Sequence, residues 1–378
     1  MKPKKMILCI IPNKKCNLKC KYCYISQMPD WYQQDYQFKY GIEHIAKCLA
    51  PERFGGPCLI NLTGEGETMI QAGIVELCSM LAKQGHYIEF VTNLTVSKVL
   101  NDFLALPADV LAHIEFKVSF HYQELTRLNM LEKFWENLEK VQQAACSFTL
   151  ELMPNDELIP DINKIIQLCE SKVGARCHLT VGRADYTTSR GLLTEMSQED
   201  YIKTWSVFES PMFDLKMNLL NVKRKEFCYA GDWTLFVNMY SGEATPCYGQ
   251  PFKQNIFDDP SKPIKFCAVG HHCVQPFCIN GHAHISLGVI PEYKCPTYAA
   301  IRNRRRQDRT EWLEPELKEV FDTKLSGTNT EYTKRQKILS SMQWYLNSLS
   351  SGLKYPQKVV RKMKLSIERK KRKYKSAK

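Results

Sequence analysis

The sequence has no run of about 18 apolar residues, so no segment of it is expected to cross a membrane as a helix. The basic start, MKPKK, is followed by a short apolar run that ends at Pro12, and no small-residue cleavage site comes after it. A secretory signal needs a longer apolar region and such a site. We therefore expect a cytoplasmic protein whose first apolar run is a buried strand.

Acidic residues are scarce in the C-terminal tail, where Lys and Arg are concentrated. The chain has a formal net charge of +12, and residues 354–378 hold twelve Lys and Arg against the single acid Glu368. The body, residues 1–353, is therefore nearly neutral. A tail of this kind favours peripheral contact with an anionic membrane surface. A solvated tail is the alternative, and nucleic acid is the least favoured partner because aromatic residues are sparse there.

Cysteine, by contrast, is abundant, with 16 in the chain. A long chain without a secretory signal is expected in a reducing compartment, where clustered cysteines serve metal binding or catalysis more often than disulfides. Seven of them lie in apolar runs and are expected in the core as small hydrophobic residues. They are Cys9, Cys48, Cys58, Cys78, Cys146, Cys169 and Cys177.

Through about residue 190, short apolar runs alternate with amphipathic segments at a period near 30 residues. The alternation predicts an α/β fold in which right-handed βα units form a partial, TIM-like (β/α)6 barrel. Strands are expected at 6–11, 57–63, 87–93, 113–120, 146–153 and 175–181, and helices include 71–84, 134–145 and 159–172. In such barrels the chemistry lies at the carboxyl ends of the strands.

Beyond this barrel, which we assign to residues 1–190, the alternation stops. The remaining parts are expected to be a helical connector, a small cysteine-rich α+β domain, C-terminal helices that include 309–321, and the polybasic tail. Their boundaries are 191–227, 228–300, 301–353 and 354–378.

Directly after the first predicted strand, residues 16–23 read CNLKCKYC. Three thiolates on one loop can converge on a metal centre, and the residues that follow offer no fourth ligand nearby. That pattern favours an iron–sulfur cluster with one open iron over a structural zinc site. A zinc-binding interaction protein without catalytic activity is the alternative.

With Tyr22 before the last cysteine, the pattern C-x3-C-x-aromatic-C resembles the signature loop of the radical S-adenosylmethionine (SAM) superfamily. The resemblance implies a [4Fe–4S] cluster on Cys16, Cys20 and Cys23, with SAM chelating the fourth iron. One electron from a reductant such as flavodoxin or ferredoxin would cleave SAM, and the resulting 5′-deoxyadenosyl radical would abstract a hydrogen from the substrate.

The stretch after the second predicted strand, LTGEGETMI, resembles the family's Gly-Gly-Glu motif, which holds the amino group of SAM. The resemblance places Gly64, Gly66 and Glu67 at that position. Two glycines allow close backbone approach, and a carboxylate can pair with an ammonium group. Thr68 stands where the family usually has proline.

Two further stretches extend the resemblance. After the third strand, Asn93 lies in a segment similar to the family's Thr-Asn-Gly turn, with Leu94 in place of the glycine. After the fourth strand, Ser119 and His121 stand where ribose contacts come from. Together with Tyr22, these residues complete the SAM contacts that the resemblance implies.

A second cysteine cluster follows the barrel. Cys228 and Cys247 are spaced C-x13-G-x4-C across a predicted hairpin, and Cys273 and Cys278 follow them. The arrangement resembles the Twitch/SPASM auxiliary domains, and the single-cluster Twitch form fits better because the C-x2-C-x5-C-x3-C run is missing. The resemblance implies a second [4Fe–4S] cluster on these four cysteines. Structural zinc is the alternative, and the competing ligands are Cys267, His271, His272 and Cys295.

The leading interpretation is a radical SAM enzyme of the oxidoreductase or epimerase type. A carbohydrate or cell-envelope glycan precursor is the favoured substrate, because Twitch-type enzymes include alcohol oxidations on sugar-like rings and no peptide-binding segment precedes the cysteine loop. An epimerase would need a hydrogen donor, for which Cys177 and Cys146 are weak candidates. The alternatives are a radical SAM enzyme that modifies RiPP-type peptides or tRNA, and a non-catalytic zinc or iron–sulfur interaction protein.

Overall fold

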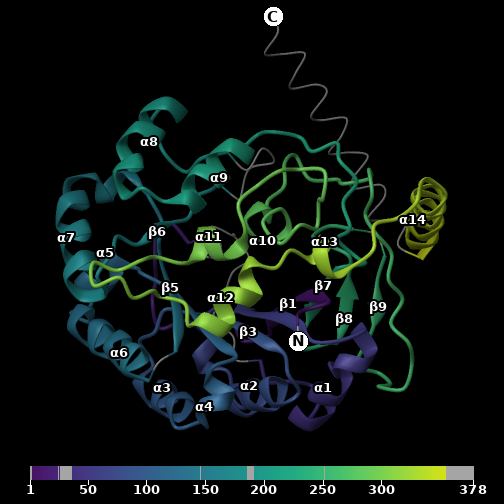
Figure 1. The fold of residues 1–378 in the computed structure, drawn as a ribbon, viewed down its shortest axis with the longest axis horizontal. Coiled ribbons are helices and arrows are strands. Elements are labelled where there is room, and N and C mark those ends of the chain that lie inside the picture. The colour runs from purple at the N-terminus through teal and green to yellow at the C-terminus, as the bar shows by residue number, and fades with distance from the viewer. Residues whose placement is uncertain are drawn as a thin grey trace, which may run out of the picture.

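A single open β-sheet forms the centre of the computed structural model, which describes residues 2–23, 25, 36–144, 146–184, 191–250 and 252–354 (Figure 1). Its nine strands have the order β6-β5-β4-β3-β2-β1-β7-β8-β9. Their bounds are β1 Lys5–Ile11, β2 Cys58–Gly64, β3 Tyr87–Thr92, β4 Ile114–Ser119, β5 Ser147–Leu152, β6 His178–Leu179, β7 Thr234–Asn238, β8 Glu243–Thr245 and β9 Gln254–Asn255.

The first six strands are parallel and lie in sequence order, which confirms the predicted α/β fold. Most of their residues are buried, as expected for apolar strands covered on both faces. The sixth strand is shorter than predicted and pairs with β5 only at His178 and Leu179. Other segments satisfy its polar groups instead, because Ser210 Oγ accepts from Leu179 N and the carbonyl of Asn303 bonds to His178 Nε2.

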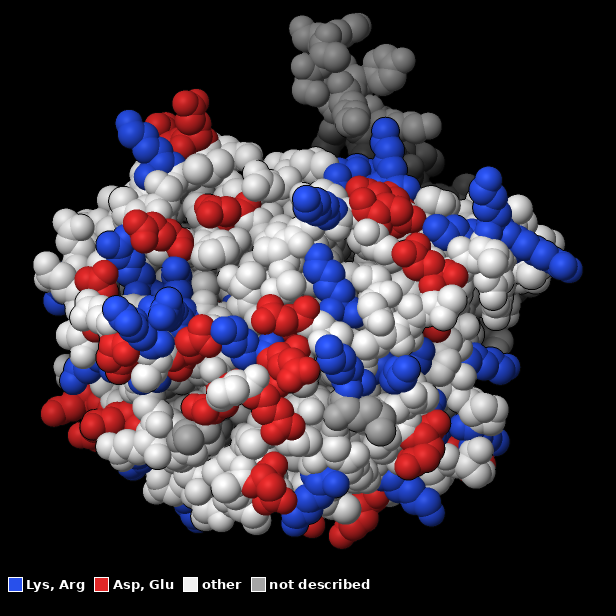
Figure 2. Space-filling view, in the orientation of Figure 1, with Lys and Arg blue, Asp and Glu red and all other residues white. Residues whose placement is uncertain are grey.

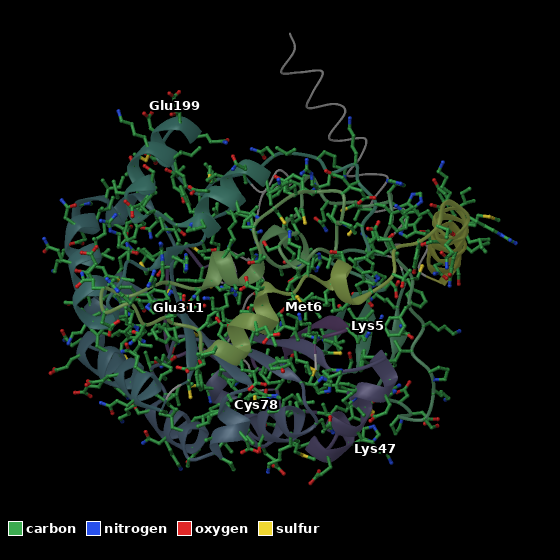
Figure 3. The ribbon with its side chains drawn as sticks, viewed as in Figure 1. Lys5, Met6, Lys47, Cys78, Glu199 and Glu311 are labelled. Atoms are coloured by element: carbon green, nitrogen blue, oxygen red, sulfur yellow. The ribbon has the colours of Figure 1, made fainter. Side chains whose placement is uncertain are left out.

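Helices surround this sheet (Figure 1). The first seven are α1 Ile42–Cys48, α2 Ile74–Lys83, α3 Ser97–Leu104, α4 Ala108–Leu111, α5 Tyr122–Arg127, α6 Leu131–Gln143 and α7 Ile162–Val173. Short 3-10 turns occur at Pro51–Phe54, Thr68–Ile70, Asp156–Asp161 and Ser206–Phe208. Helix α2 buries Ile74, Leu77, Cys78 and Leu81 on one face, at the spacing of an amphipathic helix. Cys78 is labelled in Figure 3. All seven cysteines expected in the core are buried, which confirms that prediction.

The C-terminal part contains α8 Gln198–Trp205, α9 Pro211–Leu219, α10 Gly281–His284, α11 Tyr298–Arg302, α12 Pro315–Asp322, α13 Leu325–Thr328 and α14 Lys334–Lys354. Its hairpin, β7 and β8, does not start a sheet of its own. Strand β7 pairs in parallel with β1, with Met6 opposite Thr234, and so extends the main sheet. The cysteine-rich segment therefore shares one sheet with the first six strands, and the predicted domain boundaries stay a prediction.

A buried charge cluster lies on one face of the sheet, across strands β3, β4 and β5. Arg302 on α11 is completely buried, donates to Glu89 Oε2 at 2.7 Å and pairs with Glu151. Lys117 lies 3.8 Å from Glu89 and 3.5 Å from Glu151. Burial opposes ionisation, but Arg302 and Lys117 lower the pKa of Glu89 to about 2. Tyr298, one turn before Arg302, also donates to Glu89.

Candidate active site

The loop that carries Cys16, Cys20 and Cys23 runs from the end of β1 along the carboxyl edge of the sheet. Cys23 N donates to Cys20 O at 3.1 Å in a tight turn, and Cys20 is buried. Burial, reinforced by the neighbouring cysteines, raises the pKa of the Cys16 and Cys20 thiols to about 12. These thiols therefore hold their protons at neutral pH until a metal displaces them.

Across the described ranges, no group of three or more His, Cys, Asp or Glu side chains is arranged to hold a metal ion. A four-iron cluster poses a different geometric requirement, because each of its cysteines binds its own iron atom. Three or four thiols around a common space, on secured loops, are the arrangement that fits such a cluster.

The loop after β2 packs directly against the cysteine loop. Glu67 N donates to Lys15 O at 2.9 Å, and a Cβ atom on Gly66 would lie 2.3 Å from the same oxygen. Only glycine permits this approach. Gly64, the other glycine of the predicted motif, is the last residue of β2.

The buried carboxylate of Glu67 joins the loops after β2 and β3. Its Oε1 accepts from Met69 N at 2.9 Å and from Thr92 Oγ1 at 2.6 Å, and its Oε2 accepts from Asn93 N at 2.7 Å. Burial raises the pKa of Glu67 although the three hydrogen bonds oppose the shift. The observed role is to organise the edge of the sheet, and its predicted contact with the SAM amino group stays a prediction.

The loop after β3 also reaches the cysteine loop. Asn93 Nδ2 donates to Asn17 Oδ1 at 2.9 Å, and Asn17 Nδ2 donates to Thr95 Oγ1 at 2.7 Å. Leu94 has φ 56°, the left-handed conformation that favours glycine, which stands at this position in the family's turn. Asn137 Nδ2 secures this turn by donating to Leu94 O at 2.9 Å.

The loop after β4 supplies the third attachment. Tyr22 OH and His121 Nδ1 share a hydrogen bond of 3.0 Å, and Lys19 N donates to Glu124 Oε1 at 2.8 Å. Burial lowers the pKa of His121 to about 4, so its ring is neutral. Both Tyr22 and His121 were predicted to contact SAM, and the structure joins them to each other. Ser119, the last residue of β4, is half-buried beside them.

Sequence reasoning missed Asn17, Thr95 and Glu124, which hold the cysteine loop to its neighbours. Asn17 lies between the first two cysteines, where the motif leaves the residue type open. Thr95 and Glu124 come shortly after strands β3 and β4. This position was the available signal, because the carboxyl ends of parallel strands meet at one edge of the sheet.

A cavity of about 180 Å³ lies beside Tyr22. Its walls come from β4, β5, the segment after β6, α9 and the 277–282 segment. They are Tyr22, Lys117, Glu151, Met153, Thr180, Val181, Arg183, Lys216, Leu219, Leu220 and residues 277–282. The cavity therefore extends from the cysteine loop to Cys278, one of the cysteines of the second predicted cluster.

All four cysteines of the second predicted cluster line one further cavity: Cys228, Cys247, Cys273 and Cys278. Cys228 precedes β7 and exchanges backbone hydrogen bonds with Gly270, at 3.2 and 2.8 Å, while Cys247 follows β8. Burial, with Cys273 contributing, raises the pKa of Cys278 to about 12. The structure thus brings together four residues that are up to 50 positions apart in the sequence.

Three of the four competing ligands are engaged elsewhere. Cys267 Sγ accepts from Asn347 Nδ2 at 3.8 Å, Cys295 Sγ donates to Ile285 O at 2.8 Å, and His272 stacks on Trp344. His271 lines the cavity, and its Nδ1 lies 2.9 Å from Lys225 O.

The two weak hydrogen-donor candidates lie at different levels of the sheet. Cys146 directly precedes β5 and stands at the amino end of that strand, whereas Cys177 directly precedes β6, whose two residues pair with the carboxyl end of β5. The Cys146 thiol donates to Ala144 O at 3.7 Å, and burial raises its pKa to about 12. Cys146 therefore lies away from the cysteine loop, and the hydrogen-donor role of Cys177 stays a prediction.

Residues 10–169 match the family model described as the Radical SAM superfamily, so this part of the chain is similar to radical SAM domains. A search of curated proteins finds no match.

Among solved structures, Streptococcus suis SuiB bound to S-adenosylmethionine is 14% identical, with a TM-score of 0.48 over 68% of this chain and 64% of that one. The chain thus spans less than two thirds of the length of SuiB. Native anSMEcpe with bound AdoMet and the Cp18Cys peptide is 16% identical (TM-score 0.47, covering 68% and 79%). BtrN in complex with AdoMet and 2-DOIA is 12% identical (TM-score 0.33, covering 87% and 92%).

Proposed function

We propose that the protein is a radical SAM enzyme whose cluster is held by Cys16, Cys20 and Cys23. The observation that carries the proposal is the attachment of the cysteine loop to the loops after β2, β3 and β4, at the edge of the sheet that borders a cavity. When bound, a [4Fe–4S] cluster with SAM supplies reductive cleavage of SAM and a radical that abstracts a substrate hydrogen.

The residues of this chain have separate tasks in the proposal. The hydrogen bonds of Asn17, Lys19 and Tyr22 fix the cysteine loop, so that its thiols are oriented before the cluster binds. Gly66 lets the two loops pack directly against each other, because no Cβ stands between them. Preorganisation of this kind limits the reorganisation that binding requires.

A second [4Fe–4S] cluster is proposed for Cys228, Cys247, Cys273 and Cys278. Its support is the convergence of both predicted cysteine pairs on one cavity, while three competing ligands face other partners. Cys278 also borders the cavity beside Tyr22, so a cluster there would stand close enough to the substrate space to accept an electron from it.

The proposed reaction is oxidation or epimerisation at a carbinol carbon of a carbohydrate or glycan precursor. In the oxidation, the substrate loses one hydrogen atom to the deoxyadenosyl radical, and then a proton and one electron, the latter to the second cluster. Modification of a peptide or a tRNA is the alternative, with the same radical chemistry on another substrate.

The test is 5′-deoxyadenosine formation from SAM under dithionite, measured anaerobically with the reconstituted protein. Wild type is expected to form it, and Cys16→Ala is expected to abolish it. Cys146→Ala is the matched control, because this buried cysteine lies at the far edge of the sheet and should leave the product unchanged. Equal product from wild type and Cys16→Ala would reject the proposal.

Substrate class is tested by deuterium transfer. Sugars deuterated at one carbinol carbon are expected to deliver deuterium to 5′-deoxyadenosine. If a peptide or a tRNA does so and no sugar does, the carbohydrate assignment is wrong although the radical mechanism stands.

We further propose that helix α14 and the basic tail bind an anionic membrane surface peripherally. No helix of the described residues is long and apolar enough to span a bilayer. The polybasic tail lies outside those residues apart from Lys354, but α14 leads into it. One face of α14 is docked, since Ser340, Trp344 and Asn347 bond to Ala268, Gln250 and Cys267.

The other face of α14 carries exposed apolar side chains. Ile338, Met342, Leu346 and Leu349 are 57 to 65% exposed and lie at helical spacing. The helix stands at the side of the molecule (Figure 1), whereas charges of both signs are interspersed over the face of the body in Figure 2. An apolar stripe followed by a strongly basic segment is complementary to anionic lipid, and a second copy of this basic segment would be repelled.

Sedimentation with vesicles tests this proposal. Binding is expected to vesicles that contain phosphatidylserine and not to pure phosphatidylcholine. Leu346→Ser with Leu349→Ser should weaken binding by about 100-fold, because about 3 kcal/mol of apolar burial is lost. No binding to either vesicle, together with concentration-dependent dimerisation, would show that a second copy covers this face.

A further inference from the structure

Lys216 borders the cavity beside Tyr22 without an acidic partner. It lies on α9 and is half-buried, and its Nζ donates to Thr180 Oγ1 at 2.6 Å. Among the described residues, no carboxylate lies within ion-pair distance of this nitrogen. A lysine withdrawn from water normally has such a partner.

The surroundings of Lys216 disfavour its charged form. Burial, together with the positive charges of Lys117 and Arg183, lowers the pKa of Lys216 well below its usual value, and the charge of Glu89 opposes the shift only in part. A lysine whose pKa is lowered in this way is a neutral amine near pH 7, and the lone pair of its nitrogen accepts a proton.

The other charged or basic side chains of the described lining are less suited to accept a proton. Glu151 and Lys117 lie 3.5 Å apart as an ion pair, and Arg302 also contacts Glu151, so two cations stabilise that carboxylate. Arg183 is a guanidinium and stays protonated. Burial lowers the pKa of His282 well below its usual value, which makes its ring a weak base. The amine on α9 is therefore the available base.

Two buried polar atoms of the same lining have no partner among the described residues. Asn280 is 8% exposed, and its Nδ2 lacks a hydrogen-bond acceptor. The Nδ1 of His282 is likewise unpaired. Buried polar atoms are nearly always satisfied in native proteins, so unpaired ones at the wall of a cavity indicate a ligand. Because a hydroxyl group both donates and accepts, a substrate that carries hydroxyls matches these two atoms and the neighbouring amine.

We propose that Lys216 is the base that removes the hydroxyl proton when the substrate is oxidised at its carbinol carbon. This inference rests on the proposed function and assigns the residue that receives the proton. Once the hydrogen atom on the carbinol carbon has left, the O–H bond breaks and the C=O bond forms. The proton goes to the lone pair of Lys216 Nζ, and the remaining electron goes to the second [4Fe–4S] cluster.

The position of Lys216 suits this step. The cavity extends from Tyr22 on the cysteine loop to Cys278, so its wall stands between the place where the hydrogen atom leaves and the place that receives the electron. Thr180 Oγ1 accepts one N–H of the amine and so fixes the direction of the nitrogen. A base held beside the reacting hydroxyl needs little reorganisation when the proton moves.

Acetic anhydride tests whether Lys216 is a neutral amine that faces the cavity, because only neutral amines are acylated. The iron-loaded protein without SAM is labelled anaerobically, and mass spectrometry compares each lysine with its own rate at pH 10. A lysine in water has a pKa of about 10.4, so its neutral fraction falls about 700-fold from pH 10 to pH 7. The exposed Lys203 on α8 is the reference and should slow by about that factor, whereas Lys216 should slow by less than about tenfold. Equal pH profiles of the two lysines, or no acetylation of Lys216 at any pH, would overturn the proposal.

Loss and rescue of the oxidation test the role of the amine directly. With a sugar that delivers deuterium to 5′-deoxyadenosine, Lys216→Ala should lower the carbonyl product formed per 5′-deoxyadenosine by about 100-fold or more. Ethylamine should restore part of that product, because it supplies the missing base. Lys203→Ala is the matched control and should keep the wild-type ratio. A wild-type ratio in Lys216→Ala would show that another group takes the proton.

Failure of this inference and failure of the proposed function give different results. If wild type forms no 5′-deoxyadenosine while Lys216 is acetylated at pH 7, the proposed function is wrong and the neutral amine remains. If wild type forms 5′-deoxyadenosine while Lys216 follows the pH profile of Lys203, the proposed function stands and Lys216 is not the base.

Discussion

Gly66→Ala tests whether the junction of two loops positions the cysteine loop. The new Cβ would lie 2.3 Å from Lys15 O and 2.7 Å from Lys15 C, both backbone atoms that cannot rotate away. Reaching an ordinary contact of 3.4 Å requires a displacement of about 1 Å. Such a displacement breaks the hydrogen bond from Glu67 N to Lys15 O, next to Cys16.

The loss of stability expected for Gly66→Ala is the sum of two contributions, overpacking and a broken hydrogen bond. Overpacking costs about 1–3 kcal/mol, and a lost buried hydrogen bond costs about 1–3 kcal/mol. We therefore expect Gly66→Ala to lower the free energy of unfolding by about 2–6 kcal/mol and to reduce the iron retained after reconstitution. Gly327→Ala is the control, because a Cβ there meets nothing within 4 Å.

Urea unfolding of both variants, with iron and sulfide analysis, provides the measurement. If Gly66→Ala matches Gly327→Ala in stability and iron content, the two loops are not held together as described.

Three other changes have defined outcomes. Arg302→Met removes the main partner of the buried Glu89, so it should lower the free energy of unfolding by about 3–5 kcal/mol in denaturant titration. The exposed Arg335→Met should lower it by less than about 0.5 kcal/mol. Similar losses in both variants would show that the buried charge pair does not stabilise the fold as described. Burial and the charge of Glu89 raise the pKa of Glu115 to about 7, so the contribution of the protonated side chain to stability is complete below about pH 4 and is lost as the pH rises through 7. The free energy of unfolding of Glu115→Gln should therefore rise by on the order of 3 kcal/mol relative to that of wild type between pH 4 and 8. Parallel pH profiles of the two proteins would contradict this. Cys273→Ser should lower the iron content, whereas Cys295→Ser, whose thiol bonds to a carbonyl, should not; the reverse result would reassign the ligands.

The elements that could be predicted are those set by local sequence. Each of the first five strands begins and ends within one or two residues of its apolar run, because buried parallel strands are continuously apolar. The convergence of Cys228 with Cys247 was predictable for a similar reason, since a short hairpin with Gly242 at φ 74° brings its two ends together.

Features that depend on which distant segments meet could not be predicted. The pairing of Met6 with Thr234 joins residues more than 200 positions apart, and nothing in either strand specifies the other. The same holds for Arg302, which enters the barrel from a helix that the local pattern did not indicate. Charged residues at alternating positions of apolar strands, such as Glu89 and Lys117, were the available signal for a buried partner.

The contact between Tyr22 and His121 shows a further limit. The resemblance to the radical SAM superfamily predicted that both residues contact SAM. The structure shows a hydrogen bond between them that no motif describes. A motif fixes residue type and spacing, whereas hydrogen-bond partners depend on side-chain directions after folding.

Iron and labile sulfide per chain, measured after anaerobic reconstitution, test the central claim of two clusters most directly. Wild type is compared with the Cys16/Cys20/Cys23→Ala and Cys228/Cys247→Ala variants. We expect about eight irons in wild type and about four in each variant, with 5′-deoxyadenosine lost only in the first. Zinc in place of iron, with no 5′-deoxyadenosine from wild type, would contradict the account.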